Sequence, residues 1–279
     1  MPATRTELQV VHWTLRIGAF ACYVGHGAFG IITKAAWIPY FAAVGIPEAA
    51  AWRLMPIIGT VDILMGILVL IRPMPVVLLY MTVWSVWTAL LRPLTGEGWW
   101  EFLERAGNYG VPLAFLYWSQ PGSRLREWFA AIRPQPISPV QARQLAWILR
   151  ITTAALLIGH GGFGAFMQKA AWIGYLGAAG ITPQVAQGAS LISVIGWFEI
   201  MLGLLVLAKP IPAVLIFVFV WKVGTELLRL MVGEPFWEFI ERGGSYAAPL
   251  ALLYVQRWGS VPDLRATDLT PAQDVATAP

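Results

Sequence analysis

The chain contains a long internal repeat, and this feature limits its architecture more than any other. Residues 16–34 read RIGAFACYVGHGAFGIITK and residues 150–169 read RITTAALLIGHGGFGAFMQK. Further on, GEGWWEFLERAGNYGVP at 96–112 matches GEPFWEFIERGGSYAAP at 233–249. The two matches lie 134 residues (16 to 150) and 137 residues (96 to 233) apart, far more than the 20–50 residues of a solenoid unit. The sequence therefore predicts two copies of one small domain.

The composition places both copies in a membrane. Hydrophobic residues make up 58% of the chain and charged residues only 12%, whereas soluble globular proteins have about 25% charged residues. Fifteen Trp suit the membrane–water interface, where the indole ring is buried and its N–H stays hydrated. The net charge of +4 suits loops that face an anionic leaflet. We expect the lipid bilayer as a partner, and no nucleic acid.

Apolar runs of the length that a spanning helix needs, about 20 residues, occur eight times. Pro-flanked turns at 71–75 and 208–212 separate the second and third runs of each copy, because Pro cannot continue a helix. We therefore expect an all-α integral membrane protein with eight transmembrane helices. The runs are 12–33, 52–71, 75–94 and 101–118 in the first copy, and 146–168, 187–208, 211–232 and 237–256 in the second.

The segments between the first and second spans, 34–52 and 169–187, are too short and too interrupted to span. We expect them to lie at the membrane interface, because each carries a Trp and a Tyr that suit this environment. These anchors are Trp37 and Tyr40 in the first copy and Trp172 and Tyr175 in the second.

An even number of spans inserts both copies the same way round, giving two parallel four-helix repeats. The short loops carry nine basic residues at one end of the spans and seven at the other. This bias places both termini in the cytoplasm. The membrane that we expect is the cytoplasmic (inner) membrane of a bacterium. The predicted parts are a first repeat at 1–118, a cytoplasmic linker at 119–144, a second repeat at 145–258 and a polar, disordered tail at 259–279.

Charged residues that both copies keep form the first candidate site. They gather around the start of the fourth span, where Glu101 and Arg105 are four residues apart and form a favourable helix pair. Two interpretations stay open: an ion-pair network that closes each four-helix unit, or a charged rim that binds an anionic headgroup, a substrate or a partner. The set comprises Lys34, Arg92, Glu101, Glu104 and Arg105, with Lys169, Arg229, Glu238, Glu241 and Arg242.

A second candidate set lies inside the apolar runs, where ionisable groups are costly and are functional candidates by default. Asp62 and Glu199 stand near the middle of their spans, either as carboxyls that hold helices together or as proton acceptors near a redox ligand. Only the second copy has a Lys–Glu pair four residues apart on one helix, which favours that copy as the one with an active pocket. The set comprises His26, Asp62, Trp84, His160, Glu199, Trp221, Lys222 and Glu226.

His26 and His160 stand in matching Gly-His-Gly-x-Phe-Gly contexts, and the glycines let a helix or a flat ligand approach closely. Three interpretations stay open. Each histidine could be a core residue beside a small-residue packing face, a hydrogen-bond donor to a quinone, or, as the weakest alternative, an axial ligand of a haem. Cys22 is the only cysteine, and no metal site is predicted.

Several short features recur in the same order in both copies. They are Arg16 and Arg150, His-Gly followed eight or nine residues later by Lys34 or Lys169, Y-x-x-x-x-G-I at 40–46 and 175–181, the acidic residues in DILMGILVL and EIMLGLLVL, and the Pro-containing turn before the third helix. In these features each copy resembles a DoxX-like four-helix membrane unit. The resemblance covers nearly the whole chain, as two tandem units, and implies the corresponding fold; the E-R-x-G-x-Y motif lies outside the general family pattern.

The resemblance also implies a redox association, because DoxX-like proteins are similar to the small subunit of a thiosulfate:quinone oxidoreductase and to membrane partners of redox enzymes. We therefore expect a redox-associated subunit that interacts with quinone or with a membrane or periplasmic oxidoreductase partner. The alternatives are a non-catalytic scaffold or accessory subunit, a small-molecule carrier and, more weakly, a bis-His haem protein. Walker A, G-x-S-x-G and HExxH signatures are absent, and whether the protein is an enzyme stays open.

Overall fold

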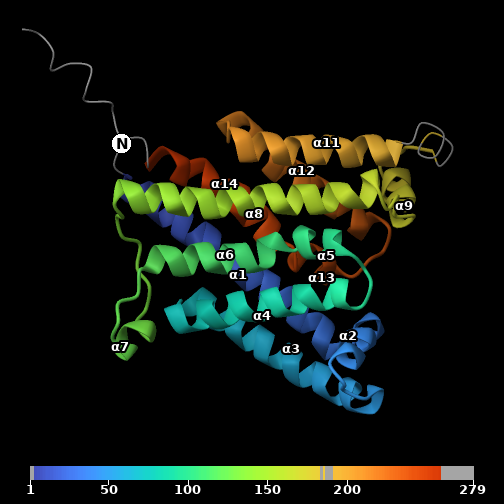
Figure 1. Ribbon diagram of the computed structural model, residues 1–279, viewed down its shortest axis with the longest axis horizontal. Helices are drawn as coiled ribbons and strands as arrows, with labels where there is room; N and C mark the ends of the chain where they lie inside the picture. The colour runs from blue at the N-terminus through green and yellow to red at the C-terminus, as the bar shows by residue number, and fades with distance from the viewer. Residues whose placement is uncertain (1–2, 183–184, 186–190, 259–279) are drawn as a thin grey trace, which may run out of the picture.

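The computed structural model describes residues 3–182, 185 and 191–258, and this part of the chain is helical with no strand (Figure 1). The prediction of an all-α protein is confirmed. The predicted tail at 259–279 and the first residues of the sixth span lie outside the described residues. The long helices are α1 (Arg5–Ile31), α3 (Glu48–Ile71), α4 (Pro75–Leu94), α6 (Ala106–Ser119), α8 (Pro139–Ala165), α11 (Leu191–Ala208), α12 (Pro212–Met231) and α14 (Gly243–Trp258).

In the described part of the chain, six short helices connect the long ones. They are η1 (Ala35–Trp37), α2 (Ile38–Ala43), α5 (Trp99–Glu104), α7 (Leu125–Trp128), α9 (Ala171–Ala178) and α13 (Phe236–Ile240). Figure 1 shows the long helices side by side along the longest axis of the molecule, with the N-terminus and α7 at one end. The helices α2, α5, α9 and α13 lie at the opposite end (Figure 1).

Among the residues that the structure describes, four helices are long and apolar enough to cross a membrane: α3, α4, α8 and α11. A fifth span results if α1 and the η1–α2 segment, which are bent by 99° relative to each other, are counted together. These apolar helices indicate a membrane protein. Within the described residues, α6, α12 and α14 do not meet the same conditions of length and composition.

The fourth run of each copy is not one continuous helix, in contrast to the expectation for 101–118 and 237–256. The helix α5 ends at Glu104 before α6 begins at Ala106, and α13 ends at Ile240 before α14 begins at Gly243. At each break an arginine side chain bonds back to the carbonyl of the residue four positions earlier: Arg105 to Glu101 at 3.0 Å and Arg242 to Glu238 at 2.7 Å. These bonds satisfy carbonyls that the broken helix leaves free.

The helices α1, α6, α8 and α14 pack together in the centre of the molecule, with α3 against α1 and α11 against α8. The central residues Leu15, Phe115, Leu149 and Leu252 are fully buried. The first helix of each half also packs against the last elements of the other half: α1 contacts α13 and α14, and α8 contacts α5 and α6. The two halves therefore share one helical core.

The glycines of the repeated Gly-His-Gly motif create these contacts. A Cβ at Gly25 would overlap the backbone of Glu241, and a Cβ at Gly159 would overlap the backbone of Glu104. The second glycine of each motif faces a different neighbour, since Gly27 of α1 packs against α3 and Gly161 of α8 packs against α11. The motif thus positions each histidine between two closely packed helices.

Candidate functional site

Two cavities lie at matching places in the two halves. The first cavity, of about 290 Å³, lies among α1, α2, α3 and α4. The second cavity, of about 420 Å³, lies among α8, α9, α11 and α12. The repeat supplies the same wall twice: His26, Trp37, Tyr40, Asp62, Trp84 and Arg92 line the first cavity, and His160, Trp172, Tyr175, Glu199, Trp221 and Arg229 line the second.

The aromatic residues between the first and second long helices of each half form one wall of each cavity. Trp37 stacks on His26 with ring centroids 6.4 Å apart, and Trp172 lies against His160 at 5.0 Å. Sequence reasoning assigned these tryptophans only to membrane anchoring and missed them as cavity residues. The signal that could have identified them is that a Trp follows the histidine at a matching position in both copies.

The tyrosine of the same segment is held by a charged pair. In the first cavity Arg92 Nη1 donates to the Tyr40 hydroxyl at 2.6 Å, and this hydroxyl donates to Glu97. In the second, Arg229 Nη1 donates to the Tyr175 hydroxyl at 3.0 Å, and this hydroxyl donates to Glu234. The Y-x-x-x-x-G-I and Gly-Glu motifs therefore meet in one contact beside each cavity, which joins α2 to α4 in the first half and α9 to α12 in the second.

The buried polar groups of the second cavity are bonded to one another. The Glu199 carboxylate accepts hydrogen bonds from His160 Nδ1 at 2.6 Å and from Trp221 Nε1 at 2.7 Å. The Glu226 carboxylate accepts from Lys222 Nζ at 3.1 Å and from Arg229 Nε at 2.6 Å. In the second cavity each of these acidic side chains therefore has donors within the protein.

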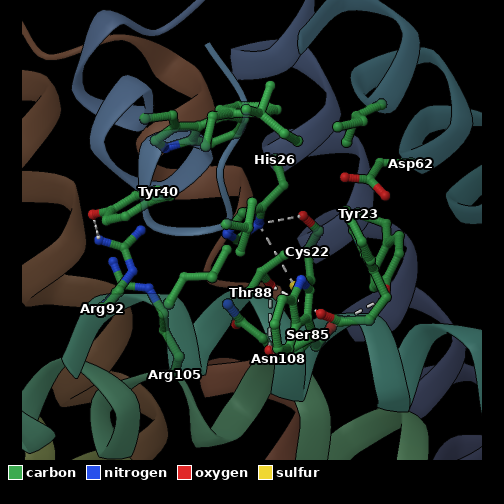
Figure 2. A pocket seen from close by; sticks show the side chains of 18 residues that line it. Cys22, Tyr23, His26, Tyr40, Asp62, Ser85, Thr88, Arg92, Arg105 and Asn108 are labelled. Carbon is green, nitrogen blue, oxygen red and sulfur yellow. Dashed lines mark hydrogen bonds between the residues drawn. The ribbon is translucent and has the colours of Figure 1, made fainter. Parts of the chain in front are cut away.

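The first cavity leaves two buried groups without a partner. Asp62 is only 5% exposed, and its Oδ1 makes no hydrogen bond; Arg92 Nε is likewise buried and without an acceptor. Figure 2 shows Asp62 and Arg92 on opposite sides of the pocket, with His26 between them.

Two sequence differences and the orientation of one histidine explain this contrast. Asp62 is one methylene shorter than Glu199, and the first-copy histidine turns away from it: His26 Nδ1 donates to the Cys22 carbonyl at 2.9 Å. Ala89 stands where the second copy has the acceptor Glu226, so Arg92 Nε has no carboxylate to bond. Trp84 is the side chain that interacts with the Asp62 carboxyl.

The ten predicted rim residues take part in a network of ion pairs. The arginine at each helix break lies at its centre: Arg105 pairs with Glu101 at 2.6 Å and Glu104 at 3.0 Å, and Arg242 pairs with Glu238 at 3.0 Å and Glu241 at 2.8 Å. Further pairs join Arg92 to Glu101, Arg229 to Glu226, Arg242 to Glu104, Lys34 to Glu238 and Lys169 to Glu101.

The lysine contacts of this network cross between the halves. Lys34 of the first half pairs with Glu238 of the second at 2.7 Å, and Lys169 of the second pairs with Glu101 of the first. His26 Nε2 likewise faces Glu241 at 3.5 Å. The structure therefore supports the ion-pair interpretation of the rim, with the network joining two halves instead of closing each one.

Two acidic residues of the network have strongly altered acidity, and both lie on short helices outside the candidate spans. Burial of the Glu104 carboxyl opposes its ionisation, but Arg105 and Arg242 outweigh burial and lower its pKa to about 2. The same balance, with Arg242 and Lys34 as the cations, lowers the pKa of Glu238 to about 2. Both groups are therefore carboxylates at neutral pH.

The two histidines do not face a common ligand. His26 lines the first cavity and His160 the second, and each has one ring nitrogen bonded within its own half. This geometry gives no support to one haem held between them. In the part of the chain that the structure describes, no group of three or more His, Cys, Asp or Glu side chains is arranged to hold a metal ion.

Comparison of the chain with family models, with curated proteins and with solved structures finds no match.

Proposed function

We propose that this chain is a redox-associated membrane subunit of the DoxX-like type that binds one small, flat molecule, a membrane quinone or its quinol, in the first cavity. The observation that carries the proposal is the pair of buried groups without partners, Asp62 Oδ1 and Arg92 Nε, in an aromatic cavity. A buried donor or acceptor without a partner costs about 1–3 kcal/mol. A ligand that bonds both groups recovers this free energy.

The shape and lining of the first cavity suit a flat ring. Trp37, Trp84 and Trp87 line it, and ligand pockets are typically apolar and aromatic with a few polar groups that fix orientation. Its volume of about 290 Å³ is at the small end of the usual range of about 300–1,000 Å³. The cavity thus has room for one ring system, whereas a long isoprenoid tail would have to extend outside it.

The cavity is open to the surface that lipid would cover. Trp87, on the apolar helix α4, lines the cavity and is 42% exposed, and the cavity residue Val44 on the neighbouring segment is also exposed. A membrane-dissolved ligand would enter between α2 and α4 without passing through water. The electrons for a change of redox state would pass between the ligand and a membrane or periplasmic partner.

The proposed placement in the membrane has eight spans, with α1, α6, α12 and α14 joining the four apolar helices and with α5 and α13 at the interface. Both four-helix repeats then have the same orientation. The end with the N-terminus, α7 and the basic linker faces the cytoplasm. The opposite end, with α2, α5, α9 and α13 (Figure 1), faces a periplasmic partner.

Ligand binding by the protein in lipid nanodiscs tests the proposal. A short-chain benzoquinone and its quinol, each titrated while Trp fluorescence is followed, should bind with a measurable Kd. Trp84→Leu should weaken binding at least tenfold, because it removes one aromatic wall. The matched variant Trp221→Leu, in the second cavity, should leave the Kd unchanged. A folded protein that binds neither form at saturating concentration would refute the proposal.

The ion-pair network favours a second candidate function, a non-catalytic scaffold that docks an oxidoreductase. Its charged residues lie together at one end of the molecule, where α5 and α13 meet. In that case Glu104→Gln with Glu241→Gln should lower stability or complex assembly. If both variants lose ligand-dependent turnover while the complex stays assembled, the scaffold function is excluded.

A further inference from the structure

We infer that the first cavity selects a ligand that donates a hydrogen bond to Asp62 and accepts one from Arg92, so that of a quinone–quinol pair it binds the reduced form. This inference rests on the proposed function and adds the redox state of the ligand. It also implies one ligand per chain, although the chain contains the cavity twice.

The first step is the polarity of the two unsatisfied atoms. We take Asp62 in its carboxylate form, in which both oxygens only accept hydrogen bonds, whereas a guanidinium Nε–H only donates them. Asp62 Oδ1 therefore needs a donor and Arg92 Nε needs an acceptor. A ligand that offers the same group type at both ends satisfies both atoms only if that group can donate and accept, as a hydroxyl can.

The second step is the placement of the two groups. Asp62 lies in the middle of α3 and Arg92 in the last turn of α4, on opposite sides of the pocket in Figure 2. Tryptophans line the space around them. The complementary molecule is therefore a flat ring system with one polar group at each end, which is the pattern of a benzoquinol.

The third step separates the quinol from the quinone. A quinol hydroxyl donates to Asp62 while the oxygen of the other hydroxyl accepts from Arg92. Both carbonyls of a quinone are acceptors only, so one of them would face the Asp62 carboxylate and leave it unsatisfied. His26 does not change this balance, because its Nδ1–H is used by the Cys22 carbonyl and its Nε2 faces Glu241.

The second cavity indicates which protein groups such a ligand replaces. There His160 supplies the donor to Glu199, and Glu226 supplies the acceptor to Arg229 Nε. Internal side chains thus take both roles that the first cavity leaves to a ligand. The second cavity has no unsatisfied group of this kind among the described residues, which is why we infer a single site.

The test compares a short-chain benzoquinol with the matching benzoquinone, under anaerobic conditions, on the full chain in nanodiscs. The quinol should bind at least tenfold more tightly, with one molecule per chain. Asp62→Asn should abolish this preference, because an amide can donate to a carbonyl. Glu199→Gln, the matched change in the second cavity, should leave the ratio of the two Kd values unchanged.

Equal affinities in the unaltered protein, or tighter binding of the quinone, would overturn this inference and leave the proposed function standing. Binding of neither form would refute the proposed function itself. Two molecules per chain would contradict the single site. Should Asp62→Asn fail to fold, the ratio and stoichiometry of the unaltered protein decide the matter on their own.

Discussion

At the scale of single residues, the glycine that precedes each histidine carries a backbone-to-backbone contact. A Cβ at Gly159 would overlap the backbone nitrogen of Glu104, and main chain cannot move aside as the end of a flexible side chain can. Gly174 on α9 has open space where its Cβ would be. The two positions therefore form a matched pair for substitution.

We expect Gly159→Ala to destabilise the protein by about 1–3 kcal/mol, the usual cost of overpacking a core. The variant must move α8 away from α5 to make room for the methyl group. Gly174→Ala should have little effect or a small stabilising one, since Ala favours helix over Gly. Thermal unfolding in detergent measures both, and equal shifts of Tm would contradict the packing role.

Neutralising Glu226 should lower the stability of the protein more than neutralising its partner Lys222. Lys222 is 1% exposed and pairs with Glu226, which also pairs with Arg229 and Arg242. Breaking a buried pair by removing one partner costs about 3–5 kcal/mol. Glu226→Gln, which leaves three cations without their shared anion, should therefore lower Tm much more than Lys222→Met. The reverse order in a detergent melt would show that Glu226 is not the centre of this cluster.

At the scale of elements, the ionised carboxylates of α5 and α13 should make the stability of the folded protein decrease in acid. The Glu104 pKa in the folded protein, about 2, lies below the value near 4.3 expected for an unfolded Glu. Its contribution to stability is therefore complete above the unfolded value and is lost as the pH falls toward 2. Tm measured from pH 6 down to pH 2.5 should fall mainly below pH 4.5, and Glu104→Gln should make that fall shallower. An unchanged slope in the variant would count against this assignment.

The bounds of the long helices could be predicted from the sequence better than the breaks that separate α5 from α6 and α13 from α14. The Pro-flanked turns fixed the boundaries of α3, α4 and α12 within a few residues, because Pro ends one helix and starts the next. The apolar run at 101–118 gave no sign of the break before Ala106. At that break Arg105 bonds back to Glu101 and Gly107 lies against Gly244 of the other half, and the second of these is a tertiary contact that an apolar run does not reveal.

The sequence predicted which residues belong to the candidate site but not which of their polar groups bond to one another. His26, Asp62 and Trp84 do line one cavity, and the repeat pointed to them. The repeat also favoured the second half as the ligand-binding one, whereas the proposed ligand lies in the first. The first cavity is favoured because Asp62 is one methylene shorter than Glu199 and because Ala89 provides no carboxylate. The effect of these differences depends on distances that the sequence does not contain.

At the scale of the whole molecule, the shared core predicts that the halves stay together without a covalent connection. A protease site inserted in the linker next to Arg126, which is exposed, would allow cleavage after folding. The two fragments should still elute together in detergent, because α1 packs on α14 and α8 on α6. Separate elution in the same detergent would mean that the contacts between halves are too weak to hold them.

The orientation can be measured because the single native cysteine is buried. Cys22 is 2% exposed, so cysteines introduced at the exposed positions Arg126 and Ala43 would report their own accessibility. In intact cells a membrane-impermeant thiol reagent should label Ala43→Cys and spare Arg126→Cys. Labelling of Arg126→Cys alone would invert the proposed orientation.

The crossed pairs Lys34–Glu238 and Lys169–Glu101 bear on how such a chain could arise. A molecule with only one unit could form these contacts only with a second copy of itself, as an obligate homodimer. When two units are joined in one gene, the same contacts form within one chain, and the sequences of the two units can differ. The two cavities can then differ, with Asp62 and Ala89 in one and Glu199 and Glu226 in the other, so that one half is free to take the proposed ligand while the other holds the fold.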